Sequence, residues 1–302
     1  MSGDQDHRAA GRHAKPEPVG RRGLLKAGLV AGAIVIPGSV ILAKEILSHG
    51  QADQPSAAPD VTARPATAQP TRTTSPRPPR PLAGKVIVLD PGHNPNNIHH
   101  LAQINKLTDA GGFLKACNTV GTETDSGFPE WAFNLDVARR ARVILRAQGA
   151  RVIMTQNGHT AYGPCNDWRA WIANRARADA SIAIHADGGP ADGYGFAALT
   201  PELVVNSQAN NSAIIKPSAE FADSLLEHFR EATSEPLSTY LGAGGIQPRD
   251  DLAGLNLSTV PKIFIECANM RNASDALKVT DPHWRAAAAE GIAASIKAFV
   301  LR

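Results

Sequence analysis

The sequence has few aromatic residues, only three cysteines and almost no excess of charge. Phe, Trp and Tyr together make up 5% of the 302 residues, and the formal net charge at pH 7 is +3. A nucleic-acid-binding domain would carry a basic patch with interleaved aromatic side chains, and we find no such segment. We also find no internal repeat. The composition therefore argues against a nucleic acid as partner.

The small positive charge is concentrated at the N-terminus. Residues 1–82 hold 11 Lys or Arg against 6 Asp or Glu, which leaves 20 against 22 for the remainder. The basic side chains of the N-terminal part would serve export, or contact with anionic lipid or wall polymer. We expect membrane contact only through this N-terminal segment, and we expect the protein to be a monomer.

Residues 1–48 have the composition of an export signal or anchor. The stretch GRRGLLK is followed by a nearly uncharged apolar run over residues 27–43. Paired arginines ahead of such a run are typical of a twin-arginine signal. An ordinary anchor helix and a buried core helix are the alternatives, and no small-x-small cleavage site directly follows the run. We expect export to the periplasm or cell wall, with or without a retained anchor.

Residues 49–82 lack large apolar side chains almost entirely. Pro, Ala, Thr, Ser, Gln and Arg dominate this stretch. Such a composition cannot bury enough apolar surface to offset the loss of chain entropy, so it predicts a disordered linker. The folded part is then a single domain over residues 83–302, which is long enough for a sizeable core.

The three cysteines, Cys117, Cys165 and Cys267, all lie in the predicted domain. Cys117 and Cys165 are in loop-like stretches, whereas Cys267 ends an apolar strand. If the protein is exported, the compartment permits disulfides, and an odd count leaves one thiol free. We expect Cys117 to pair with Cys165. The alternative is three unpaired small hydrophobic residues.

Short apolar runs alternate with amphipathic stretches along the domain. We expect strands over residues 85–89, 151–154, 180–184, 193–199 and 262–265, and helices over residues 130–148, 167–178, 218–232 and 282–301. This alternation predicts an α/β domain with a mainly parallel, twisted sheet covered by helices on both faces. In such sheets, sites form where the strands end.

Four polar residues stand out against this framework, and each also has an ordinary interpretation. His93 follows an Asp-Pro-Gly turn after the first strand, where a histidine is often only solvated. His185 ends the third strand. Glu130 opens a helix behind Pro129, where its charge would favour the helix dipole in any case. Glu266 ends the fifth strand, and burying its carboxylate is costly unless it is paired or functional.

Taken together, these residues have the composition of a hydrolytic zinc centre. Two imidazoles and one carboxylate suit zinc and leave a fourth position for water, while a further carboxylate can move protons. We see no competing Ser-His-Asp arrangement. Cys267 lies next to an acidic residue on a buried strand, which would raise the pKa of its thiol and make it a poor nucleophile.

Several ordered motifs resemble one family. They are GKVIVLDPGHN, the helix opened by Glu130, WRAWIANRARADASIAIHAD with Arg169 and Asn174, and a late strand that ends in Glu266 and continues as CANM. This series is similar to the zinc-dependent N-acetylmuramoyl-L-alanine amidases of the third class, which trim bacterial peptidoglycan. GPC, HADGG and DLAGLNL look especially like a small, exported mycobacterial or actinobacterial form without a separate wall-binding module.

The resemblance implies one zinc ion per domain, with His93, Glu130 and His185 as ligands and Glu266 as the catalytic carboxylate. It implies hydrolysis of the amide bond between the lactyl group of N-acetylmuramic acid and L-alanine, in peptidoglycan or its fragments. Two departures are visible. Residues 154–157, MTQN, stand where the family often has Thr-Arg, which puts an arginine contact in doubt. Cys267 and Ala268 replace a frequent Leu-Gly pair.

Two other functions stay open at this point. The chain could be a catalytically silent sensor of wall fragments on the same fold, or a zinc peptidase that cuts within the stem peptide. The products of a peptidoglycan digestion would separate the three possibilities.

Overall fold

The computed structural model describes residues 80–302. The signal or anchor predicted over residues 1–48, and the linker predicted over residues 49–82 except its last three residues, lie outside this part of the chain. Within the described residues, no helix is both long enough and apolar enough to cross a membrane.

The described part of the chain alternates strands and helices. The strands are β1 (Val86–Pro91), β2 (Leu107–Asp109), β3 (Leu114–Ala116), β4 (Arg151–Met154), β5 (Ala180–Asp187), β6 (Ala197–Pro201), β7 (Ile246–Arg249) and β8 (Lys262–Asn269). The α-helices are α1 (Leu101–Ile104), α2 (Glu130–Ala147), α3 (Asn166–Ala176), α4 (Ile215–Thr233), α5 (Ala253–Asn256), α6 (Ala273–Thr280) and α7 (Pro282–Val300), with 3-10 turns η1 (Asn97–His99) and η2 (Ser212–Ile214).

Residues 80–302 form a six-stranded sheet in the order β4-β1-β5-β8-β6-β7, and β2 pairs with β3 in a separate hairpin. The four strands β4, β1, β5 and β8 are parallel to one another. β6 runs antiparallel to β8, and β7 is parallel to β6. The expectation of a mainly parallel sheet is confirmed, with two reversed strands at one edge.

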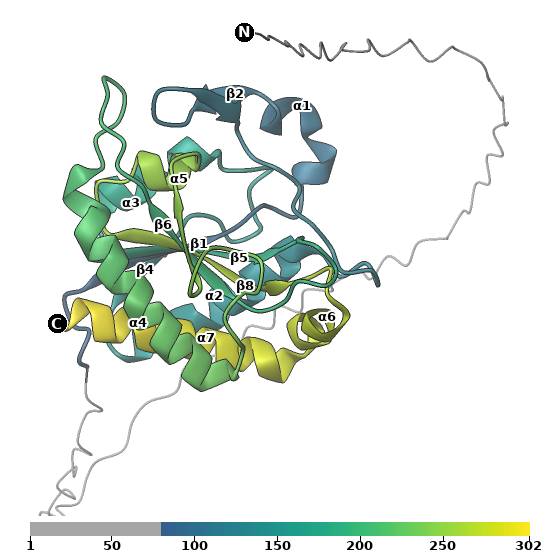
Figure 1. Cartoon of the computed structure of the whole chain (residues 1–302). Coiled ribbons are helices and arrows are strands. Elements are labelled where there is room, and N and C mark those ends of the chain that lie inside the picture. Colours follow the sequence, from purple (N-terminus) through teal and green to yellow (C-terminus); the bar gives the residue numbers. More distant parts are fainter. Residues whose placement is uncertain (1–79) are drawn as a thin grey trace, which may run out of the picture. The chain divides into compact units, whose positions relative to one another are not determined.

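Helices cover both faces of this sheet (Figure 1). α2, α4 and α7 pack together on one face, and α3 and α5 lie on the other, next to the β2–β3 hairpin. The strand interiors are apolar on both sides, as expected for buried parallel strands. Ile87, Ile182 and Ile265, for example, are fully buried in the main core with the apolar stripe of α7.

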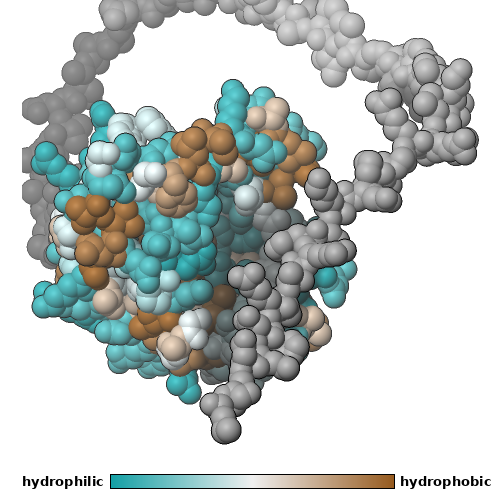
Figure 2. Space-filling view, turned by 45° about the horizontal axis from the view of Figure 1, so that its top comes forward, coloured by the Kyte–Doolittle hydropathy of each residue, from teal (hydrophilic) through white to brown (hydrophobic). Residues whose placement is uncertain are grey.

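The sequence pattern did not predict β7 or the β2–β3 hairpin, and the strand expected over residues 193–199 begins too early for β6. β7 contains only one large apolar residue and is interrupted by Pro248, so it gives no strand pattern. β6 begins at Ala197 instead of residue 193, because Gly193 lies against the ring of Tyr240 and Gly195 has a positive φ of 93°. Apolar residues on the face that carries α3, α5 and the hairpin gather in separate patches (Figure 2).

Candidate active site

A cavity opens at the carboxyl ends of β1, β5 and β8. Its volume is about 420 Å³, and its lining includes all four residues that the sequence singled out, His93, Glu130, His185 and Glu266. Because β1, β5 and β8 are adjacent and parallel, their carboxyl ends meet at one edge of the sheet. The four residues therefore lie together at the strand ends, where sheets of this kind build sites.

His93 lies just beyond β1 in a backbone conformation that non-glycine residues rarely adopt. Its φ is 60°, and its carbonyl oxygen accepts hydrogen bonds from Arg169 Nη2 and Gln156 Nε2 at 2.9 and 3.1 Å. These two donors stabilise the turn after Asp90-Pro91-Gly92. The ring nitrogen Nδ1 lies 3.1 Å from the Thr119 carbonyl oxygen. That contact orients the imidazole so that Nε2, the nitrogen that could bind a metal, points toward Glu130.

Glu130 is the first residue of α2, and its carboxylate lies between the two histidines. Oε2 is 2.8 Å from His93 Nε2, and Oε1 is 2.8 Å from His185 Nδ1. The backbone N–H of Thr122 also donates to Oε2 at 3.0 Å. Burial raises the pKa of Glu130, but His93 and His185 outweigh burial and hold that pKa well below its usual value. The carboxylate is thus kept in the charged form that binds cations.

His185 is near the end of β5, where Phe264 stacks on its ring with the centroids 4.1 Å apart. Gly92 lies against the other side of the ring, and an added Cβ there would overlap the imidazole. Burial lowers the pKa of His185, although Glu130 partly offsets this effect. The imidazole is therefore held as the neutral form that coordinates metals.

The ligand atoms of His93, Glu130 and His185 all lie within 4.8 Å of one another. Among residues 80–302, they form a group of histidine and carboxylate donors that could hold a metal ion. Glu266 is not part of this group, although it is paired with His185 across the β5–β8 ladder. Its buried Oε2 has no hydrogen-bond partner within the described residues. Burial, with Glu130 and Asp187 nearby, raises the pKa of Glu266 well above its usual value.

A buried ion network behind His93 was not predicted from the sequence. Asp90 binds Arg169 at 2.7 Å and Lys262 at 2.9 Å, and all three side chains are at most 5% exposed. Arg169 also donates to the carbonyl oxygen of Pro91, so it holds both ends of the turn that carries His93. Lys262, a lysine at the start of an apolar strand, was the one feature of the sequence that could have indicated this network. Its partner Asp90, 172 residues away, could not be read from the pattern.

The MTQN stretch, residues 154–157, supports the same turn. Thr155 Oγ1 donates to Asp90 at 2.6 Å, and Gln156 Nε2 donates to the carbonyl oxygens of Pro91 and His93. The departure from the family pattern therefore puts neutral hydrogen-bonding groups behind the turn that carries His93.

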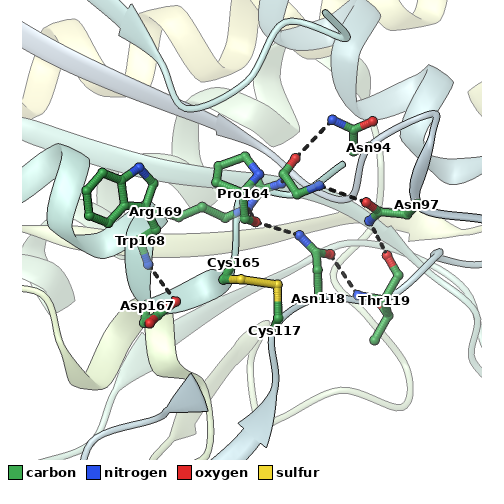
Figure 3. The surroundings of a disulfide bond; sticks show 11 residues. Asn94, Asn97, Cys117, Asn118, Thr119, Pro164, Cys165, Asp167, Trp168 and Arg169 are labelled. Atoms are coloured by element: carbon green, nitrogen blue, oxygen red, sulfur yellow. Dashed lines mark hydrogen bonds between the residues drawn. A yellow bond between two sulfur atoms is a disulfide. The ribbon is translucent and has the colours of Figure 1, made fainter. Parts of the chain in front are cut away.

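The predicted pairing of Cys117 with Cys165 is present (Figure 3), with Cα atoms 4.3 Å apart, and the free Cys267 is buried. The bond joins the segment after β3 to the residue before α3. Asn118 extends this link, because its side chain donates to the Pro164 carbonyl and accepts from the Thr119 N–H. The disulfide thus restrains Thr119, which contacts the His93 ring.

Comparisons with known proteins agree with this geometry. A mycobacterial relative, the N-acetylmuramoyl-L-alanine amidase Rv3717 of Mycobacterium tuberculosis, is 35% identical over 236 residues, which cover 78% of this chain and 94% of that protein. The crystal structure of the N-acetylmuramyl-L-alanine amidase Ami1 from Mycobacterium smegmatis matches with a TM-score of 0.67 and 40% identity, over 72% of this chain and 98% of the other. The apo form of Ami1 from Mycobacterium abscessus matches with a TM-score of 0.65 and 39% identity, over 72% of this chain and 99% of the other.

The fold and the site together define an enzyme of the α/β class with a candidate metal centre at its strand ends. The chain belongs to the N-acetylmuramoyl-L-alanine amidase family, whose model matches residues 87–298. The resemblance inferred from the motifs is confirmed, and the match spans nearly the whole described domain.

The contact between Gly92 and His185 yields a prediction about the metal centre. A Gly92→Ala substitution should displace the His185 ring and weaken the binding of a metal ion at this candidate site at least about tenfold, the scale seen when groups that orient a ligand are lost. Zinc affinity can be measured by competition with a chromogenic chelator. Gly254→Ala is the matched control, because a Cβ there would stay 3.4 Å from Lys262 Nζ. Equal affinities in the two variants would contradict this prediction.

The network behind His93 predicts a dependence of stability on pH. Lys262 and Arg169 overcome the effect of burial and lower the pKa of Asp90 below the ordinary value of 3.8. A depressed acid pKa stabilises the fold above the unfolded-state pKa, and this contribution is lost as pH falls below it. Asp90→Asn should therefore lower the free energy of unfolding by about 3–5 kcal/mol at pH 7, because it leaves buried cations unpaired. Urea unfolding should show that the difference in unfolding free energy between the unchanged protein and Asp90→Asn becomes smaller below about pH 4. A difference that stays constant down to pH 2 would disprove the assignment.

Proposed function

We propose that His93, Glu130 and His185 bind one zinc ion and that Glu266 carries protons during amide hydrolysis. The bond cleaved joins the lactyl group of N-acetylmuramic acid to L-alanine of the stem peptide, in peptidoglycan or its fragments. The observation that carries this proposal is the convergence of His93, Glu130 and His185 on one point of the cavity. Glu266 lines the same cavity, and its Oε2 has no hydrogen-bond partner within residues 80–302.

The donor set fits zinc by its chemistry. Two imidazoles and one carboxylate are a common catalytic zinc set, which keeps one position open. His93 has the second contact, from Nδ1 to a backbone carbonyl, that orients a metal-binding histidine. When bound, zinc supplies a Lewis acid that polarises a carbonyl oxygen and makes a water more acidic.

The chain's own groups account for the proton transfers. Glu266 lies across from His185 in the β5–β8 ladder and lines the same cavity, so its carboxyl group would stand beside an attacking water at the proposed zinc site. It would accept the proton from that water and later deliver it to the departing amine of L-alanine. Burial and the nearby Glu130 and Asp187 raise the pKa of Glu266, which is the direction in which carboxyl groups that act as general acid and base are shifted.

The proposal extends to the parts outside the described residues. Residues 1–48 would direct export through a twin-arginine signal or act as an anchor, and residues 49–82 would be a linker to the catalytic domain over residues 83–302. We propose a monomer that acts in the periplasm or cell wall, with membrane contact only through the N-terminal segment. The disulfide between Cys117 and Cys165 supports export, because such bonds persist in oxidising compartments.

Analysis of the digestion products tests the reaction. Peptidoglycan incubated with the zinc-loaded protein should release intact stem peptides that carry a new L-alanine amino terminus. Shorter peptides or free amino acids would identify a peptidase instead. The absence of products with a folded, metal-loaded protein would identify a sensor. Mass spectrometry of the soluble fraction separates these outcomes.

The roles proposed for Glu266 and His185 predict different losses in variants. Glu266→Gln should keep near-stoichiometric zinc and lose at least about 100-fold in rate, the usual effect of removing a general base or acid. His185→Ala should lose zinc and activity together. Metal analysis and amidase assays on the same preparations test both. A Glu266→Gln variant with near-normal activity, or one that loses its zinc, would overturn the assignment of roles.

A further inference from the structure

A ladder of exposed rings runs along α3. Trp168 and Trp171 are stacked with their ring centroids 4.1 Å apart and their planes 14° from parallel. The guanidinium of Arg175 lies 5.0 Å from the Trp171 ring. Trp168 is 50% exposed and Trp171 is 40% exposed, although tryptophan is usually well buried. We call these three residues the tryptophan ladder.

The ladder ends in an aromatic ring, that of Trp168, which is half exposed. Within the described residues, Trp171 is contacted by Trp168 and by Arg175, whereas Trp168 stacks on Trp171 alone. Because Trp168 is also 50% exposed, its accessible ring surface can receive one more flat, partly apolar group. An exposed apolar cluster of this kind on a surface helix often marks a binding site.

The opposite side of the same helix forms a wall of the active-site cavity. Asn166 and Arg169 line the cavity, and residues 168, 171 and 175 lie roughly half a turn away around the helix. Figure 3 shows that the Trp168 ring and the Arg169 side chain leave α3 in different directions. Since a helix with its side chains is about 10–12 Å thick, the ladder stands about that far from the cavity.

We propose that the tryptophan ladder binds the glycan strand of peptidoglycan, through sugars next to the one that carries the scissile amide. This inference rests on the proposed function, which places a sugar polymer at the cavity. The C–H groups on one face of a pyranose ring carry a partial positive charge and stack on the negative face of an aromatic ring. The stem peptide begins with a small residue, L-alanine, which offers no such ring.

Calorimetric titration of the full chain with the hexasaccharide of β-1,4-linked N-acetylglucosamine tests the site directly. This probe has no stem peptide and no charge, so neither the amidase reaction nor the basic N-terminal residues contribute. Trp168→Ala should bind it about threefold to tenfold more weakly than the unchanged protein, the scale of one aromatic contact. Trp168→Tyr should retain most of the affinity, because it keeps a stacking face.

Leu277→Ala is the matched control, because Leu277 is a 74% exposed apolar residue on α6. Hydrolysis of a soluble muramyl dipeptide, too short to reach the ladder, should be unchanged in all these variants, whereas hydrolysis of intact walls should slow in Trp168→Ala.

Equal hexasaccharide affinities for Trp168→Ala and Leu277→Ala, or no binding by the unchanged protein at millimolar concentration, would overturn the inference. The inference would also be overturned if Trp168→Ala changed the oligomeric state of the protein without changing its hexasaccharide affinity. That result would assign the ladder to contact with a second copy of the chain. Hexasaccharide binding without any amidase activity would contradict the proposed function and leave the glycan site standing.

Discussion

The buried carboxylate of Glu130 is the constraint on which the rest of the site depends. A charged group out of contact with water costs several kcal/mol unless it is paired, and Glu130 is only 4% exposed. The charge is stabilised by two imidazoles, by the backbone N–H groups of Thr122 and Ala186, and by the side-chain amide of Asn134. Moving Glu130 by one helical residue would break these contacts together. The start of α2 is therefore fixed by the site as much as by the core.

The two histidines reach Glu130 with different kinds of support. His185 belongs to the centre of the sheet, where it is held by Phe264 on one side and by the absence of a side chain at Gly92 on the other. His93 belongs to a turn with an unfavourable backbone conformation, so it needs more external contacts. Arg169 and Gln156 hold its carbonyl oxygen, and Thr119 holds its ring.

Most of the site was predictable because its members occupy strand and helix ends that the sequence marks clearly. His185 and Glu266 end uninterrupted apolar runs, and Glu130 follows a proline at a helix start. The buried network of Asp90, Arg169 and Lys262 was not predictable, because it depends on contacts across more than 70 residues of sequence. The reversal of β6 and β7 was missed for a related reason. Whether a strand runs parallel or antiparallel depends on the strand it pairs with. The hydrophobic pattern of a single strand is the same in either direction, so it does not predict the direction.

The unequal support of the two histidines makes the candidate site depend on the disulfide between Cys117 and Cys165. The segment that carries Thr119 has little regular structure, and Cys117 fastens it to the start of α3. Reduction would free this segment and loosen the support of His93, while His185 would stay fixed by the sheet. Such bonds persist in oxidising compartments, and there the support of His93 is kept.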